Sequence, residues 1–111
     1  MQSCAEVEAR VLEVVSMVVS AVRIPVAVKL SPFFSALPHF AQQLRGAGAA
    51  GLVLFNRFYQ PDLDPEELQV KPTLKLSDPY ELRLRLRWLA ILSATVPGDL
   101  CASGGVHTGL D

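Results

Sequence analysis

Hydrophobic residues in the first segment, residues 3–23, recur at helical spacing. Ser3 is followed three residues later by Glu6, the pattern of a capping box at a helix start. One wide face of this helix is apolar, built from Val7, Val11, Val14, Val15, Val18, Val19 and Val22. Such a face predicts a helix that packs against a sheet.

Three short apolar runs have the length and composition of strands. They are "VAVKL" at 26–30, "LVLF" at 52–55 and "DLCASGGV" at 99–106. Continuous hydrophobicity over so few residues is typical of parallel strands that are covered on both faces. We therefore expect the middle of a parallel sheet.

The intervening segments predict two more helices and a long excursion. In residues 33–51, Pro38 suits a first helical turn and Gly46 and Gly48 suit a helix end. Within residues 80–96, positions 82–87 alternate leucine and arginine like a strand, but Asp78-Pro79 is a helix start and the length favours a helix. Residues 59–79 read as an excursion with an extended piece at 73–77, long enough to be a functional lid.

The resulting order of helices and strands requires a parallel sheet with right-handed crossovers. A doubly wound sheet and a (β/α)8 barrel both satisfy it. Each strand delivers polar residues or glycines at its carboxyl end, where a barrel keeps its active site, and this favours the barrel. Since a full barrel needs about 250 residues and a new helix start follows at Thr108, we expect one domain, residues 1–111, that is part of a TIM (β/α)8 barrel.

Composition and charge exclude several classes of protein. The 111 residues carry a formal net charge of -1 and 19% charged side chains, so nothing favours a nucleic-acid partner. Glu8, Arg10, Glu13 and Arg23 interrupt the longest apolar run, and Glu6 and Glu8 occupy the position of a basic signal-peptide region. Two distant cysteines, Cys4 and Cys101, suit neither a metal site nor a disulfide framework. We expect a cytoplasmic protein without a membrane segment.

Candidate chemistry lies where the three strands end. Lys29 either extends to solvent or faces an anion or an electron-rich ring. Asn56 can hydrogen-bond a planar ring with carbonyl and NH groups, or form a turn. Gly104 and Gly105 can turn their amides toward a phosphate or merely make a tight turn, and Ser103 can add a hydroxyl.

Other polar residues receive ordinary structural interpretations. We expect His39 and His107 to be surface or capping residues and Cys101 to be in the core. Arg57 is a candidate anion ligand, with solvent exposure as the simpler account. The arginines at positions 83, 85 and 87 predict a solvated helix face.

Three motifs in order, "IPVAVKLSP", "GAGAAGLVLFNRFYQPDLD" and "LCASGGVHT", resemble consecutive segments of the dihydroorotate dehydrogenase family, especially its bacterial dihydroorotate dehydrogenase-like members. The resemblance covers essentially the whole chain. It implies strands five to seven of an FMN-dependent barrel that oxidises dihydroorotate, or a similar dihydropyrimidine, to orotate in pyrimidine biosynthesis. The cofactor implied is FMN.

The resemblance also implies roles for individual residues. Lys29 would contact the flavin near N1 and O2 and stabilise the reduced anionic ring. Asn56 would bind the substrate pyrimidine, and Gly104 and Gly105, with Ser103 beside them, would hold the FMN phosphate. Arg57 and Phe58 depart from the serine or threonine that follows this asparagine in better-studied members.

The family's catalytic base lies upstream of the lysine, and this chain has no residue at a matching position. No catalytic residue is therefore assigned, and the chain alone is expected to be inactive. Two alternatives remain open. One is a phosphate-binding barrel isomerase or synthase, which the glycine pair would serve equally. The other is a non-catalytic half-barrel that hides its sheet edges by forming a homo-oligomer.

Overall fold

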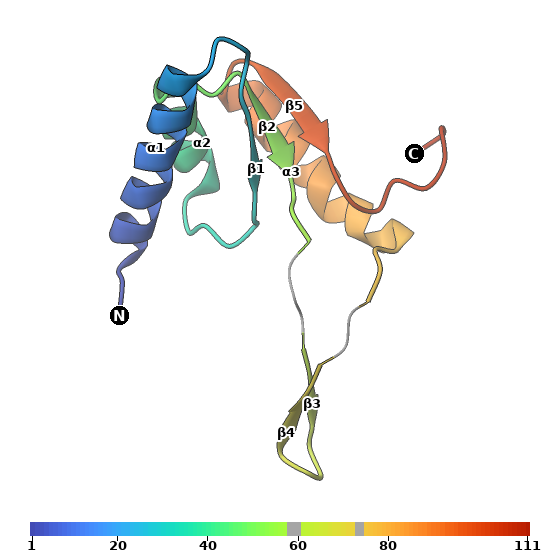
Figure 1. Ribbon diagram of the computed structural model, residues 1–111. Helices are drawn as coiled ribbons and strands as arrows, with labels where there is room; N and C mark the ends of the chain where they lie inside the picture. The colour runs from blue at the N-terminus through green and yellow to red at the C-terminus, as the bar shows by residue number, and fades with distance from the viewer. Residues whose placement is uncertain (58–60, 73–74) are drawn as a thin grey trace.

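A parallel sheet of three strands forms the centre of the computed structural model, which describes residues 1–57, 61–72 and 75–111. The strands are β1 (Ala27–Leu30), β2 (Gly51–Leu54) and β5 (Asp99–Ala102), in the order β1-β2-β5 (Figure 1). The predicted parallel pairing is thus confirmed. These strands form an open sheet, and the described residues do not close a barrel.

Three α-helices accompany the sheet at the predicted places, each with a local sequence cause. The first, α1 (Cys4–Ala21), begins at a complete capping box of Ser3 and Glu6. The second, α2 (Leu37–Gly46), has Pro38 in its first turn. The third, α3 (Leu82–Thr95), follows a short 3-10 helix, η1 (Pro79–Glu81), whose N-cap is Asp78.

All three helices contribute to a single core on one face of the sheet. Strand residues that alternate toward this face, such as Leu30, Leu52 and Leu54, are buried against Phe40 and Leu92. The complete set of buried apolar residues is Val15, Leu30, Leu37, Phe40, Ala41, Leu44, Ala49, Leu52, Leu54, Phe55, Leu92 and Val96. Packing this set supplies the main driving force for folding.

The opposite face of the sheet is uncovered by any described element. Its edge-strand residues Ala27, Lys29, Asp99 and Cys101 are exposed, while Val53 on the central strand is half-buried. The expectation that the strands are covered on both faces is therefore wrong. Cys101, predicted to be in the core, is exposed because strand alternation turns it to the open face.

Helix α1 packs against α2 at the edge of the sheet rather than across the strands. Only Val15 of its valines is fully buried, and Val11 and Val19 are partly buried against the core. Val14 and Val18 are exposed. The apolar face predicted for this helix is thus wider than the face that the fold buries.

The excursion between β2 and α3 contains an antiparallel hairpin that the sequence pattern did not predict. Its strands are β3 (Asp62–Asp64) and β4 (Gln69–Lys71), joined by a turn with Leu68 at a φ of 53°. In Figure 1 the hairpin extends away from the sheet instead of crossing the strand ends as a lid. Of the extended piece predicted at 73–77, Thr73 and Leu74 lie outside the described residues, and residues 75–77 form no strand.

The last residues form a turn closed by Asp111. Asp111 Oδ2 accepts hydrogen bonds from the backbone N–H groups of His107 and Thr108, both at 2.7 Å. The bond from Thr108 has the form of the predicted N-terminal cap, but the residues after it form a turn and no helix. Among the helices that the structure describes, none combines the length and hydrophobicity needed to cross a membrane.

Candidate functional site

The carboxyl ends of β1, β2 and β5 meet at one edge of the sheet. Leu30, Leu54 and Ala102 occupy the same level of the parallel register. Beyond them, the Asn56 N–H donates to the Leu30 carbonyl at 2.7 Å, and the Ser103 N–H donates to the Leu54 carbonyl at 2.6 Å. The backbone therefore brings Asn56 and the loop after β5 next to the end of β1, as the sequence predicts for parallel strands.

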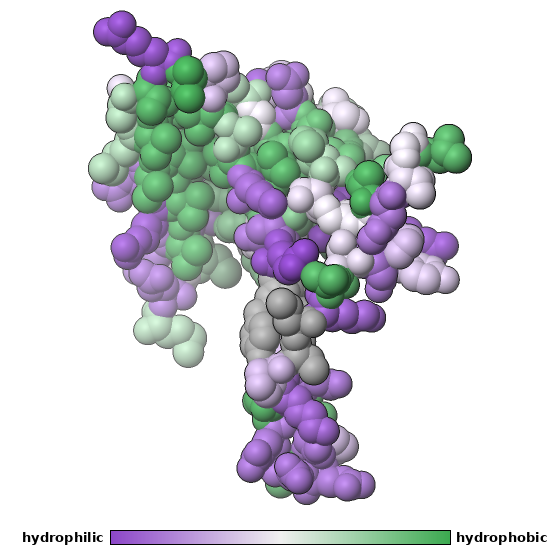
Figure 2. Space-filling view, turned by 45° about the vertical axis from the view of Figure 1, so that its right-hand side comes forward, coloured by the Kyte–Doolittle hydropathy of each residue, from purple (hydrophilic) through white to green (hydrophobic). Residues whose placement is uncertain are grey.

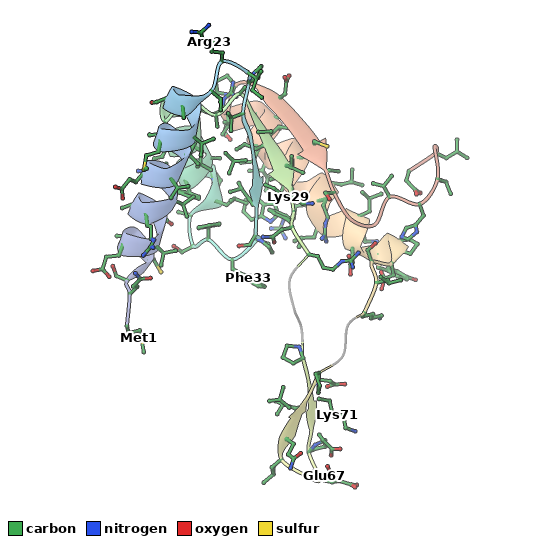
Figure 3. All side chains as sticks on the ribbon, viewed as in Figure 1. Met1, Arg23, Lys29, Phe33, Glu67 and Lys71 are labelled. Atoms are coloured by element: carbon green, nitrogen blue, oxygen red, sulfur yellow. The ribbon has the colours of Figure 1, made fainter. Side chains whose placement is uncertain are left out.

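Lys29 stands on the uncovered face, one residue before the end of β1. It is level with Val53 and Cys101 across the sheet, and Figure 3 shows its side chain leaving β1 beside β2. Because Lys29 is exposed, the ammonium group avoids the desolvation cost of a buried charge. The described part of the chain offers it no ion-pair partner, so its charge is available to an anion.

Asn56 carries an unsatisfied acceptor at the end of β2. Its side-chain Oδ1 is buried, and no described residue donates a hydrogen bond to it. An acceptor left in this state costs about 1–3 kcal/mol. The backbone of Asn56 is fixed by its bond to Leu30. A donor group of a bound molecule would satisfy this oxygen and remove the cost. In the alternative interpretation, a turn-forming asparagine, the oxygen would accept a hydrogen bond from a neighbouring backbone N–H group.

Gly104 and Gly105 form a loop of unusual backbone geometry after β5. Both have positive φ, 93° and 81°, which glycine adopts without a steric penalty. Within the described chain, neither N–H group donates a hydrogen bond. Successive amides in such a loop form a concave site for anions.

The same glycines are also required by packing. A Cβ on Gly105 would lie 2.5 Å from the backbone nitrogen of Leu82, and one on Gly104 would lie 3.0 Å from the Arg85 guanidinium. The loop therefore touches the beginning of α3 closely. This contact fixes the loop whether or not its amides bind a ligand.

Arg85 is a buried residue of the site that the sequence interpretation placed in solvent. Only 4% of it is exposed. Its Nε donates to the Ser103 carbonyl at 3.0 Å and its Nη1 to the Glu81 carbonyl at 2.9 Å, while the guanidinium lies 5.9 Å from the centre of the Phe55 ring. Arg85 thus joins the ends of β2 and β5 to the start of α3.

The burial of Arg85 corrects the prediction of a solvated arginine face. Arg83 and Arg87 are exposed as predicted, but helical spacing places Arg85 on the same face as Leu89 and Leu92. That spacing was the signal that could have identified it. The charge is tolerated because the Glu81 carboxylate lies 3.8 Å away and two carbonyls accept hydrogen bonds from the guanidinium.

The remaining candidates contribute little to the strand ends. Ser103 is half-buried and its carbonyl is occupied by Arg85, but its hydroxyl makes no bond to described residues. Arg57, His39 and His107 are exposed, and Phe58 lies outside the described residues. No group of three histidine, cysteine or acidic side chains in the described ranges could hold a metal ion.

Comparisons with known proteins add no family context to this site. No protein-family model matches the chain, and no curated protein matches its sequence at a significant level. The relationship to dihydroorotate dehydrogenases is therefore a proposal that has to be supported by the geometry of the strand ends.

Proposed function

We propose that this chain is the flavin- and substrate-binding part of an FMN-dependent oxidoreductase of the dihydroorotate dehydrogenase type. The observation that carries the proposal is the meeting of Lys29, Asn56 and the Gly104-Gly105 loop at one end of one sheet. These are three chemically different groups, a cation, an amide and a pair of free N–H groups. Together they match a ring that gains negative charge, a pyrimidine and a phosphate.

The arrangement of layers supports a partial (β/α)8 barrel over a doubly wound sheet. The three strands follow one another in chain order, and α1, α2 and α3 all belong to the core on one face. A doubly wound sheet would place helices on both faces. In a barrel, the face that carries Lys29 and Val53 would point to the interior, and the strand ends would lie at the face where barrel enzymes act.

Within this proposal each residue has a limited task. When bound, FMN would supply the hydride acceptor for C6 of a dihydropyrimidine. Lys29 would hold a positive charge near the bound ring, Asn56 would orient the pyrimidine through its Oδ1, to which no described residue donates, and the amides of Gly104 and Gly105 would hold the phosphate. We assign binding and orientation to these residues, and we assign proton transfer from C5 to no residue of this chain.

Flavin titration tests the assignment directly. The protein is expected to quench the fluorescence of FMN and to bind riboflavin, which lacks the phosphate, more weakly. Equal affinity for the two flavins would contradict the role of the glycine loop. Binding of inorganic phosphate without any flavin binding would favour the alternative, a phosphate-binding isomerase or synthase.

The charge of Lys29 is tested by a single substitution. Lys29→Ala is expected to weaken the binding of reduced FMN relative to oxidised FMN by about fivefold, since an exposed charge pair contributes up to ~1 kcal/mol. Arg23→Ala is a matched control, because Arg23 is an exposed cation near the opposite end of β1 (Figure 3). An equal effect of both substitutions would show that the net charge of the protein, and not the position of Lys29, determines the preference for reduced FMN.

A further inference from the structure

The hairpin of residues 62–71, which we name the acidic arm, lies apart from the rest of the molecule. Figure 1 shows it extending beyond the strand ends, and all its residues except Asp64 are exposed. A two-stranded hairpin without further packing is marginally stable in water. The arm therefore gains stability from any surface that covers it.

The arm combines negative charge with exposed apolar side chains. Leu63 and Val70 are opposite each other in the register and are 68% and 60% exposed. Leu68 in the turn is 85% exposed. The acidic residues are Asp62, Asp64, Glu66 and Glu67, against the single cation Lys71. In Figure 2 this part of the molecule is mostly hydrophilic with hydrophobic atoms between.

The two glutamates at the tip carry charges that no described cation pairs with. Asp64 is already paired with Lys71 at 2.8 Å, and its Oδ1 accepts the backbone N–H groups of both Glu66 and Glu67. The side-chain carboxylates of Glu66 and Glu67 form no ion pair with a described residue. Figure 3 shows Glu67 at the very end of the hairpin.

A complementary surface exists on the outer side of α3, which we name the basic helix face. Arg83 and Arg87 are exposed and lie one turn apart on the same side of the helix. Leu84 and Leu86, 37% and 51% exposed, flank them. This face therefore presents two cations between two apolar side chains, the reverse of the charge pattern on the arm.

We propose that the acidic arm of one molecule docks on the basic helix face of a second copy of this chain. Glu66 and Glu67 would pair with Arg83 and Arg87, and the exposed leucines and Val70 would cover Leu84 and Leu86. A two-fold axis would make this contact twice, because each copy offers one arm and one helix face. The proposal does not depend on flavin binding.

A second copy is the occupant that the charges favour. One chain carries both halves of the contact, and the structure holds them apart, with the arm beyond the strand ends and α3 against the sheet (Figure 1). Opposite charges on two patches promote encounter and fix which surfaces meet. An unrelated partner would need only one of the two patches.

Charge exchange between the patches tests the proposal. The double variant Arg83→Glu/Arg87→Glu and the double variant Glu66→Arg/Glu67→Arg are each compared with the unchanged protein by sedimentation equilibrium across micromolar concentrations. Each variant alone places like charges at both contacts and is expected to raise the dimer dissociation constant on the order of 100-fold or more. An equimolar mixture restores both opposite-charge contacts and is expected to dimerise again.

The possible results distinguish this dimer contact from a dimer formed through another surface. Far-UV circular dichroism verifies that each exchanged variant remains folded, as expected for exposed positions. A monomeric unchanged protein would overturn the proposal. So would a dimer that both variants retain, which would point to the open sheet face, or a mixture of the variants that stays monomeric.

Discussion

At the scale of single residues, Gly105 connects the candidate site to the fold. It is buried, has positive φ and lies against the first residues of α3. Any side chain there would face a strained backbone and a collision with the Leu82 backbone, which cannot move as a flexible side chain can. The position of the loop after β5 thus depends on the absence of one methyl group.

We predict that Gly105→Ala lowers the free energy of unfolding by about 1–3 kcal/mol, the range for a residue held in an unfavourable backbone region. Gly109→Ala is the matched control, because its Cβ would have nothing within 4 Å. Urea unfolding of both variants measures the difference. Equal stability of the two would mean that the close contact between the loop and α3 does not exist in solution.

Sequence patterns predicted the site residues unequally. Lys29 lies one residue before the end of an apolar strand, and Asn56 and the glycine pair lie just after strand ends, so their position at one sheet edge could be predicted from parallel pairing alone. Arg85 was missed because the leucine and arginine alternation suggested an exposed row. Its burial depends on the Ser103 carbonyl and the Phe55 ring, contacts that only the tertiary structure defines.

At the scale of elements, α1 is defined mainly by its N-terminal cap. The Glu6 carboxylate accepts the Ser3 N–H at 2.6 Å, and the Ser3 hydroxyl accepts the Glu6 N–H at 3.2 Å. The hydrogen bond from the Ser3 backbone, followed by the interaction with the Ser3 side chain, lowers the pKa of Glu6. The ionised carboxylate is therefore the form that stabilises the helix start.

This lowered pKa sets the pH dependence of the cap. The stabilisation is complete above the unfolded-state pKa of about 4.3 and is lost as the pH falls through the lower folded-state pKa. We predict that Glu6→Gln lowers the thermal midpoint slightly at neutral pH and that the difference disappears in acid. Thermal unfolding followed by circular dichroism at several pH values measures it, and a difference that grows in acid would contradict the assignment.

Elements with strong local signals were predicted well, and the hairpin, which lacks such a signal, was not. The helix starts at Ser3 and Asp78 and the strand residues between glycine or proline are visible in the sequence. The hairpin was missed because residues 62–71 have only a short alternation of leucine, valine and acidic residues, interrupted by Pro65. Its strands are three residues each, below the length at which alternation identifies a strand.

At the scale of the whole molecule, the defining feature is a sheet covered on one face only. The sequence predicted coverage on both faces because the strands are apolar throughout, yet Lys29, Asp99 and Cys101 face outward from the sheet. The uncovered face and the acidic arm lie away from the helical core (Figure 1). The uncovered face and the acidic arm are therefore separate from the surfaces that stabilise the fold, whereas the strand ends share Gly105 and Arg85 with the packing of α3.

The central claim is that one ligand contacts the ends of all three parallel strands. Backbone amide shifts in a ¹⁵N-labelled sample during titration with FMN test it most directly. We predict that the largest shifts occur at Leu30, Asn56, Gly104 and Gly105, while the amides of α1 do not change. Shifts confined to the acidic arm or to the helices, or no shifts at saturating FMN, would contradict the claim.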